Sequence, residues 1–271
     1  MPGDNSSRAG GVIVGYSPDT KKNLLDAETA MTEAAGSPSP SSPGIWEDFV
    51  DIFVQPAQVF ERRREGKFGL ALLALVVITG VLFFALRNGI APIMDAEMAK
   101  QAAAMAAKNP NITADQIAAQ QGMMEKFAVI GYVLFMPIGI VITAVLLWLA
   151  GKLVSASIAF AAAMMIATYS QFPRIVEMIL NALQGLMLPP ESITSRYSVQ
   201  IGVARFLDAS TNPFVLTLLG GLDLFTVWVT VLLAIGLSVV ARVPRKQAAI
   251  AAGMVWLVGL LPSLYQALSQ G

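Results

Sequence analysis

Five long apolar stretches follow one another between residues 68 and 268. They cover residues 68–86, 127–151, 153–172, 214–241 and 247–268. The stretch 214–241 contains a single charged residue, Asp223, and the others contain no Asp, Glu, Lys or Arg. A helix of about 20 apolar residues can cross a hydrocarbon core about 30 Å thick. The pattern therefore predicts an all-α fold, a polytopic membrane bundle of five transmembrane helices.

An amphipathic segment, here called the elbow (residues 45–67), leads into the first predicted span. Apolar residues recur on one helical face, namely Trp46, Phe49, Val50 and Phe53. Acidic residues fall outside that face: Glu47, Asp48 and Asp51. Pro56 suits the first turn of a second short helix, in which Val59 and Phe60 continue the apolar surface. We expect the elbow to lie in the membrane interface with Trp46 near the headgroups, or to pack on the bundle.

The first 44 residues have a different composition. They begin MPGDNSSRAGG, end GSPSPSSPG and contain no apolar segment like that of a secretory signal peptide. Polar sequence of this kind cannot bury enough apolar surface to fold alone. The chain is therefore predicted to have three parts: a disordered tail (1–44), interfacial amphipathic helices (45–67) and a five-span membrane domain (68–268).

Cations gather in three short segments that alternate correctly for one side of a membrane. These are Arg62, Arg63, Arg64 and Lys67 before the first span, Lys152 between the second and third, and Arg242, Arg245 and Lys246 between the fourth and fifth. The loops on the other side are longer, and their cations are spread thinly. Because positive loops are retained in the cytoplasm, we expect the N-terminus inside and the C-terminus outside. The first cluster either sets this topology alone or also attracts anionic lipid.

Composition narrows the function classes. Only 13% of the residues are charged, against about 25% in soluble domains, and the mean hydropathy is +0.64. The net charge of zero argues against nucleic-acid binding. Cys and His are both absent, which removes disulfides, thiolate chemistry, histidine metal ligands and every His-based triad. With no Walker-type loop and one aspartate within a span, we expect no enzyme, no cofactor and no metal site.

Asp223 is the most unusual residue of the predicted spans. An ionisable side chain inside a bilayer costs about 2.5–3.5 kcal/mol on insertion scales and is by default a candidate for function. The second interpretation is structural: Asp223 lies near the outer interface, or it caps a broken helix that begins after Gly220-Gly221. We favour this structural role.

Small and polar side chains form two stripes at helical spacing. One stripe holds Asp223, Thr226, Thr230, Ala234 and Ser238, and the other holds Ser155, Ala159, Ala163 and Ala167. Such stripes let membrane helices approach closely, and we favour a helix–helix seam over a polar permeation path. The seam can close within one chain or between two copies, so a homo-oligomer is one expectation.

The third apolar stretch continues past Pro173 into a second apolar run. Residues 174–188 are predicted to form an amphipathic helix on the outer surface, with a kinked or re-entrant helix as the alternative. Arg174 and Glu177 are three residues apart and can pair on one helix face, and either can meet Asp223.

Three short segments resemble motifs of a known membrane family. Residues 55–62 (QPAQVFER) resemble the Pro-x-x-x-Phe motif that precedes the first span of bacterial YIP (Ypt-interacting protein) domains. Residues 168–173 (TYSQFP) resemble the Tyr-x-x-x-Pro element at the end of their third span. Residues 222–237 resemble their fourth-span pattern of aspartate, aromatic residue, tryptophan and a leucine-glycine stretch. With five spans, the resemblance covers Trp46 to about Leu268.

The resemblance implies a role for each matched position. It implies four structural positions: Pro56, Phe60, Tyr169 and Pro173. It implies two further motif positions, Asp223 and Trp228. Eukaryotic relatives of the family bind Rab-type GTPases in vesicle trafficking. Nothing in this sequence indicates a eukaryotic setting, so we expect a bacterial cytoplasmic membrane and no Rab partner.

Two functions of different classes follow from these features. The first is a non-enzymatic integral membrane protein that organises the bilayer or binds a protein partner through its tail and elbow. Its candidate lipid or partner surface comprises Trp46, Phe60, Arg62, Arg63, Arg64 and Lys67. The alternative is a transporter or channel subunit in which Asp223 contacts a cation or proton, with Thr226 and Trp228 as further candidate intramembrane residues.

Overall fold

The computed structural model describes residues 22, 23, 25, 44–109, 111–208 and 210–268. The chain separates into two units, Met1–Gly44 and Ile45–Gly271. The predicted disordered tail lies almost entirely outside the described residues, and the fold belongs to the second unit.

Helices supply the regular structure of this unit. The α-helices are α2 (Ile45–Val54), α3 (Pro56–Arg62), α4 (Gly69–Ala85), α5 (Arg87–Lys108), α6 (Ala114–Leu153), α7 (Phe160–Ser170), α8 (Pro173–Met187), α9 (Pro213–Gly220), α10 (Leu224–Ala241) and α11 (Arg245–Leu268). Three 3₁₀ turns join α8 to α9: η1 (Pro190–Ser192), η2 (Arg196–Val199) and η3 (Val203–Phe206). The described residues form no strand, only an isolated bridge between Gly202 and Asp223. The all-α fold class is confirmed.

Three of the described helices are long and apolar enough to cross a membrane. They are Val133–Leu153 at the end of α6, Leu224–Ala241 and Arg245–Leu268. A fourth candidate arises if α4 and α5, which are bent by 84° at a short break, form one crossing. The protein is thus a multi-pass membrane protein by its helices, whereas the five-span count stays a prediction.

The predicted span 153–172 is wrong as a single helix. α6 ends at Leu153, residues 154–159 are not helical, and α7 begins at Phe160. Ser155 adopts a φ of 60°, in the left-handed region, where the chain leaves α6. A serine hydroxyl can hydrogen-bond to nearby backbone groups and so disfavours the interior of a helix, but it carries no charge. A search for uncharged apolar stretches therefore does not reveal this break. With 11 residues, α7 is only about 16 Å long.

The predicted span 214–241 is also divided. α9 ends at Gly220 and α10 begins at Leu224, so the double glycine marks a break in the helix. Gly220 also makes room for a neighbour, because a Cβ there would lie 2.2 Å from the Tyr197 ring. The chain therefore turns between the two helices at a position where only glycine fits.

α7 lies at the centre of the hydrophobic core. Its residues 162–170 are all buried, and α4, α6 and α10 pack around it. α5 and α8 cross at very short range: a Cβ on Gly89 would lie 2.2 Å from the carbonyl oxygen of Ala182. A Cβ on Gly185 would in turn lie within 2 Å of the Gly89 carbonyl oxygen. Paired glycines are what allow two membrane helices to approach this closely.

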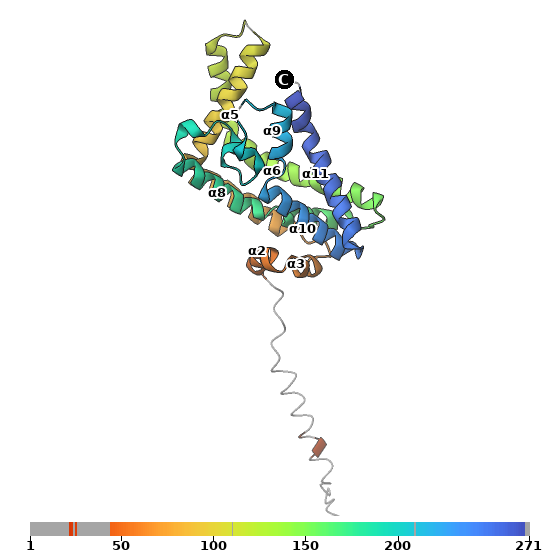
Figure 1. The fold of residues 1–271 in the computed structure, drawn as a ribbon. Coiled ribbons are helices and arrows are strands. Elements are labelled where there is room, and N and C mark those ends of the chain that lie inside the picture. The colour runs from red at the N-terminus through yellow and green to blue at the C-terminus, as the bar shows by residue number, and fades with distance from the viewer. Residues whose placement is uncertain (1–21, 24, 26–43, 110, 209, 269–271) are drawn as a thin grey trace, which may run out of the picture. The chain divides into compact units, whose positions relative to one another are not determined.

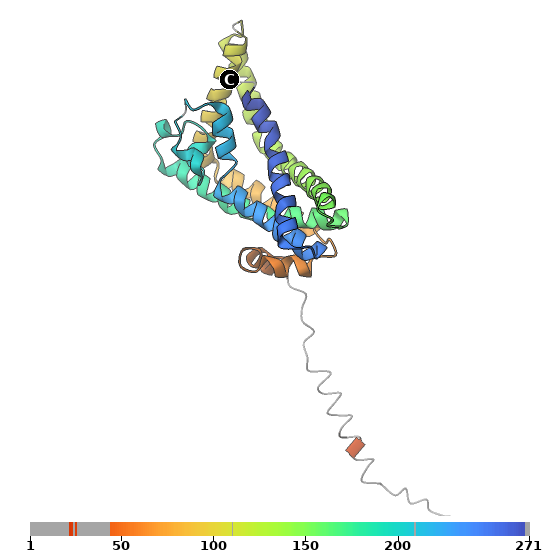
Figure 2. The same cartoon turned by 45° about the vertical axis from the view of Figure 1, so that its right-hand side comes forward.

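The elbow crosses one end of the bundle. Figures 1 and 2 show α2 and α3 together beneath α10, and the C-terminal end of α11 at the opposite end. Both ends of α7 reach the elbow, because Gly66 lies against Ala161 and Asp48 bonds to Tyr169. A helix that crosses the bilayer has only one end at a given interface. α7 therefore runs alongside the elbow, and an elbow lying flat in the interface excludes α7 as a complete crossing by itself.

Candidate functional site

α2 has apolar residues on two faces. Trp46, Val50 and Val54, spaced four residues apart, form an outer stripe with 71%, 58% and 68% of their surface exposed. Phe49 and Phe53 turn inward and are half-buried, next to the fully buried Ile52. The single apolar face predicted for this helix is therefore divided between the bundle and the outside.

Asp48 lies on the inward face and has no exposed surface. The sequence pattern placed Asp48 outside the apolar face, with Glu47 and Asp51, and the structure corrects this. Its Oδ1 accepts a hydrogen bond from Arg62 Nη2 at 3.0 Å, and its Oδ2 accepts from Arg63 Nε at 2.6 Å and from the Tyr169 hydroxyl at 3.0 Å. A buried carboxylate is tolerated when its charge is paired and its lone pairs are satisfied, as here. Asp48 thus ties α2, the end of α3 and the end of α7 together.

The basic cluster is neutralised within the elbow. Each of its cations forms a salt bridge: Arg62 with Asp48 and Asp51, Arg63 with Asp48, Arg64 with Glu61, and Lys67 with Glu65. Burial lowers the pKa of Arg63, but the hydrogen bond and charge of Asp48 outweigh it, and the net pKa is raised above the usual value. The cluster therefore offers anionic lipid less net charge than its composition suggests.

Aromatic rings join the elbow to the membrane helices. Phe49 meets Phe172 with ring centroids 5.4 Å apart, and Phe172 stacks on Tyr169 at 5.6 Å. Phe53 meets Trp228 of α10 edge to face at 5.5 Å. Such pairs contribute about 0.5–1.5 kcal/mol each beyond the area they bury. Trp228, a candidate intramembrane residue, is therefore part of the elbow contact.

Phe60 anchors the second helix of the elbow. Pro56 occupies the first turn of α3, as predicted, and Phe60 is completely buried. It lies over Gly236 of α10, where a Cβ would come within 3.1 Å of the Phe60 ring and 2.6 Å of Ile166. Phe60 is therefore a packing residue and does not belong to an exposed lipid or partner surface.

Asp223 caps α10. Its Oδ1 accepts hydrogen bonds from the backbone N–H groups of Phe225 at 2.9 Å and Thr226 at 3.1 Å, and the Thr226 hydroxyl donates to its Oδ2. The side chain is 2% exposed. A carboxylate at this position satisfies otherwise unpaired N–H groups and faces the positive end of the helix. The structural interpretation of Asp223 is confirmed in this respect.

Arg174 and Glu177 extend this polar network. Arg174 Nη1 donates to Glu177 Oε2 at 2.6 Å, and its Nη2 donates to the Thr226 hydroxyl oxygen at 3.0 Å. The predicted Arg174–Glu177 pair is therefore present, and Arg174 reaches Asp223 through Thr226. Pro173 stands at the first turn of α8, directly before Arg174. The N-terminal ends of α8 and α10 thus meet at one cluster of charged side chains.

Two cavities adjoin this polar network. A cavity of about 240 Å³ has a polar wall made by Thr143, Gln171, Arg174, Thr226 and Thr230. A groove of about 740 Å³, largely apolar, lies between α4, α5 and α6 and shares Thr143, Gln171 and Arg174 with the first cavity. Within the part of the chain that the structure describes, no group of three or more acidic side chains could hold a metal ion.

These observations define a class, the multi-pass α-helical membrane proteins. A family model described as the Yip1 domain matches residues 50–265, and the chain belongs to this family. The match runs from α2 to α11; it includes the Asp223 network and the Arg62, Arg63 and Tyr169 partners of Asp48, but not Asp48 itself. Searches of curated proteins and of solved structures gave no match.

Proposed function

We propose that this protein is a non-enzymatic, YIP-like membrane scaffold that uses its elbow to bind a partner or to organise the bilayer surface. The observation that supports the proposal is the outer stripe of α2. Trp46, Val50 and Val54 are exposed on a helix whose other side is fixed to α7 and α10. A contact surface held in place before binding loses little conformational entropy on binding. The N-terminal segment (residues 1–44) and a second copy of the chain are further proposed contacts.

The proposed topology has five crossings, with the N-terminus in the cytoplasm of a bacterium and the C-terminus outside. In this scheme the third crossing is made by α7 and α8 together and the fourth by α9 and α10 together. Each is interrupted once, at residues 171–172 and 221–223. Both ends of α7 contact the elbow, and the scheme is supported by α8, which continues the chain from there to its crossing with α5.

Spin labels test the elbow proposal directly, because the chain has no cysteine to remove first. A nitroxide on Val50→Cys in proteoliposomes is compared with one on Glu47→Cys, an exposed position on the same helix. The proposal expects the Val50 label to be reached by oxygen and shielded from a water-soluble nickel complex, or to be immobilised by a bound protein. A Val50 label as mobile and as accessible to nickel as the Glu47 label would contradict it.

A transporter or channel subunit is the second candidate. The observation that favours it is the meeting of two interrupted helices at a polar cavity, an arrangement that membrane transporters use for ligand sites. Flux of cations or protons is measured in proteoliposomes for the native chain and for Asp223→Asn, which keeps the capping oxygen. Flux lost in the variant supports transport through this site, and flux absent from both supports the scaffold.

A further inference from the structure

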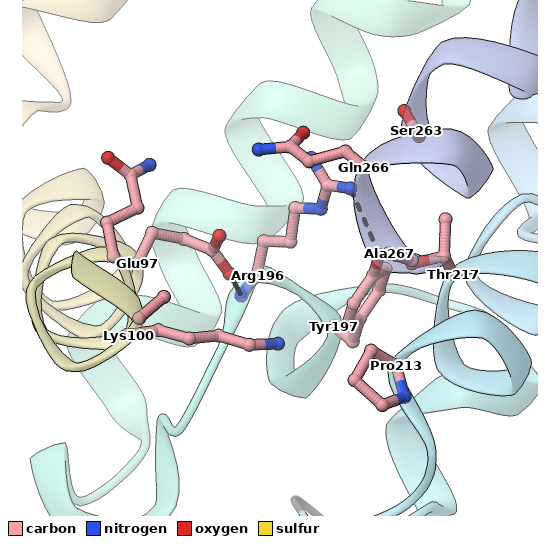
Figure 3. A pocket seen from close by; sticks show the side chains of 11 residues that line it. Glu97, Lys100, Arg196, Tyr197, Pro213, Thr217, Ser263, Gln266 and Ala267 are labelled. Atoms are coloured by element: carbon pink, nitrogen blue, oxygen red, sulfur yellow. Dashed lines mark hydrogen bonds between the residues drawn. The ribbon is translucent and has the colours of Figure 1, made fainter. Parts of the chain in front are cut away.

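A small polar pocket lies at the end of the bundle away from the elbow. It is bordered by four segments that are distant in sequence: α5, η2, α9 and the last turns of α11. Its polar lining comprises Glu97, Lys100, Gln101, Arg196, Tyr197, Thr217, Ser263 and Gln266. Figure 3 shows the Lys100 ammonium extending from α5 toward Tyr197 and Pro213, with the Arg196 guanidinium beside Gln266. Side chains from separate helices thus converge on one space.

The pocket has more positive than negative side chains. It contains two cations and one carboxylate, and no described carboxylate forms a salt bridge with the Lys100 or Arg196 side chain. The Glu97 carboxylate instead accepts a hydrogen bond from the backbone N–H of Arg196 at 2.8 Å. The pocket therefore has a net positive charge and side-chain N–H donors that remain for a ligand.

The wall that carries Arg196 is held in position. Arg196 Nη2 donates to the Tyr197 hydroxyl at 3.0 Å, and the guanidinium lies over the Tyr197 ring, 5.0 Å from its centroid. Tyr197 is 6% exposed, its hydroxyl faces Thr217 at 3.5 Å, and its ring fills the space left by Gly220. A cation fixed by the fold binds an anion without first losing side-chain freedom.

The size of the pocket limits its ligand. Its volume is about 150 Å³, and one water needs only about 10–15 Å³ of such space. The pocket therefore has room for several waters or for one small oxyanion. An arginine fork, a lysine ammonium and hydroxyls approaching from different sides are the groups that bind phosphate oxygens.

We propose that this pocket binds a phosphate group. The phosphate can belong to a lipid headgroup or to a small free solute. The lipid is the source favoured by the surroundings, because α11 is a candidate span and Tyr265 and Leu268, beside the pocket residues, are 77% and 63% exposed. The lining of this pocket includes neither Asp223 nor any residue of the elbow.

Two binding measurements on the full chain test the proposal. Inorganic phosphate is titrated calorimetrically into the protein in dodecyl maltoside micelles, which contain no phosphate. Retained lipid is counted by native mass spectrometry after release from nanodiscs that contain phosphatidylglycerol. Each is performed on the native chain, on Lys100→Met, on Arg196→Gln, and on Lys108→Met as the control on the same helix outside the pocket.

The expected result is binding in at least one arm that weakens about tenfold or more in Lys100→Met and in Arg196→Gln but less than about twofold in Lys108→Met. Loss only in the calorimetric arm identifies a free phosphate, and loss only in the lipid arm identifies a headgroup. No binding in either arm would overturn the proposal, and so would equal weakening in all three variants. The thermal unfolding temperature of each variant is measured as well, to check that the variant keeps its fold.

Discussion

Asp48 is a fully buried carboxylate that serves three donors from two other segments of the chain. Two of the donors carry positive charge, so the burial of Asp48 depends on Arg62 and Arg63 keeping their positions. Removing Asp48 leaves the partly buried Arg63 and the buried Tyr169 without this partner, whereas Arg62 keeps its salt bridge with Asp51; breaking a buried pair costs more than the intact pair contributes. A single substitution in this group is therefore expected to weaken the attachment of the elbow to the bundle.

Replacing Asp48 with alanine is expected to destabilise the protein by about 3–5 kcal/mol, because Arg63 and Tyr169 lose their shared partner. Asp51→Ala is the control, since among the described residues Asp51 forms its salt bridge with Arg62 at a partly exposed site, and it should cost less than about 1 kcal/mol. The measurement is the free energy of unfolding in detergent micelles. Equal costs for the two variants would show that the Asp48 network does not hold the elbow.

Gly236 supports a second residue-level prediction. A Cβ there would lie 2.6 Å from Ile166 and 3.1 Å from Phe60, so Gly236→Ala should cost about 1–3 kcal/mol through overpacking. Gly253→Ala in α11 meets no atom within 4 Å and should be neutral or stabilising by up to about 1 kcal/mol. Unfolding of both variants in the same micelles gives the comparison, and a tolerated alanine at 236 would refute the close packing of α3 on α10.

At the level of elements, interruption is the main feature of the middle of the chain. The apolar stretch 153–172 becomes a non-helical segment and α7, and the stretch 214–241 becomes α9 and α10. At the first interruption the backbone N–H groups of Val154 and Ala156 donate to the Gly151 carbonyl oxygen. At the second, Asp223 accepts hydrogen bonds from the N–H groups at the start of α10, and the neighbouring Arg174 is paired with Thr226 and Glu177. Backbone left without partners in an apolar setting would cost several kcal/mol per group.

The capping role predicts different effects for two variants of Asp223. Asp223→Ala removes the acceptor and should destabilise the protein by about 1–2 kcal/mol. Asp223→Asn keeps an acceptor oxygen and should be the less destabilised of the two, since Asn is also a favoured cap residue. Chemical unfolding followed by circular dichroism measures both. An asparagine variant as unstable as the alanine variant would mean that the charge, and not the cap, is what the site needs.

For the whole molecule, the two ends of the bundle have different chemistry. One end carries the elbow with its internally paired charges and its exposed apolar stripe. The other end carries the polar pocket between α5, η2, α9 and α11. The proposed topology places the first end at the cytoplasmic surface and the second outside.

Cysteine labelling tests this orientation. Lys152→Cys and Arg245→Cys should react with a membrane-impermeant maleimide only after the cells are permeabilised, because both cations lie at helix ends, Lys152 in the last turn of α6 and Arg245 at the start of α11. Asp208→Cys, in the long connection before α9, should react in intact cells. The native chain has no cysteine and gives the background. Labelling of Lys152 and Arg245 on opposite sides would exclude the proposed arrangement.

Prediction from sequence succeeded where the evidence was local. Pro56 opens a short helix, Arg174 pairs with Glu177 three residues later, and a double glycine is followed by a capping Asp223. Each involves residues within one turn or two of each other. The buried position of Asp48 could not be predicted, because its partners follow 14, 15 and 121 residues later.

The sequence by itself indicated that this is a helical membrane protein with lipid around its apolar helices. Long uncharged stretches require lipid or a large core around them, whatever the tertiary contacts, because apolar burial depends on composition and length. Only the tertiary structure decided that residues 154–159 interrupt the third apolar stretch, how the charges of the elbow are paired and which face of α2 is exposed. These depend on contacts between distant segments, where a glycine, a serine or a carboxylate has consequences that its neighbours in sequence do not reveal.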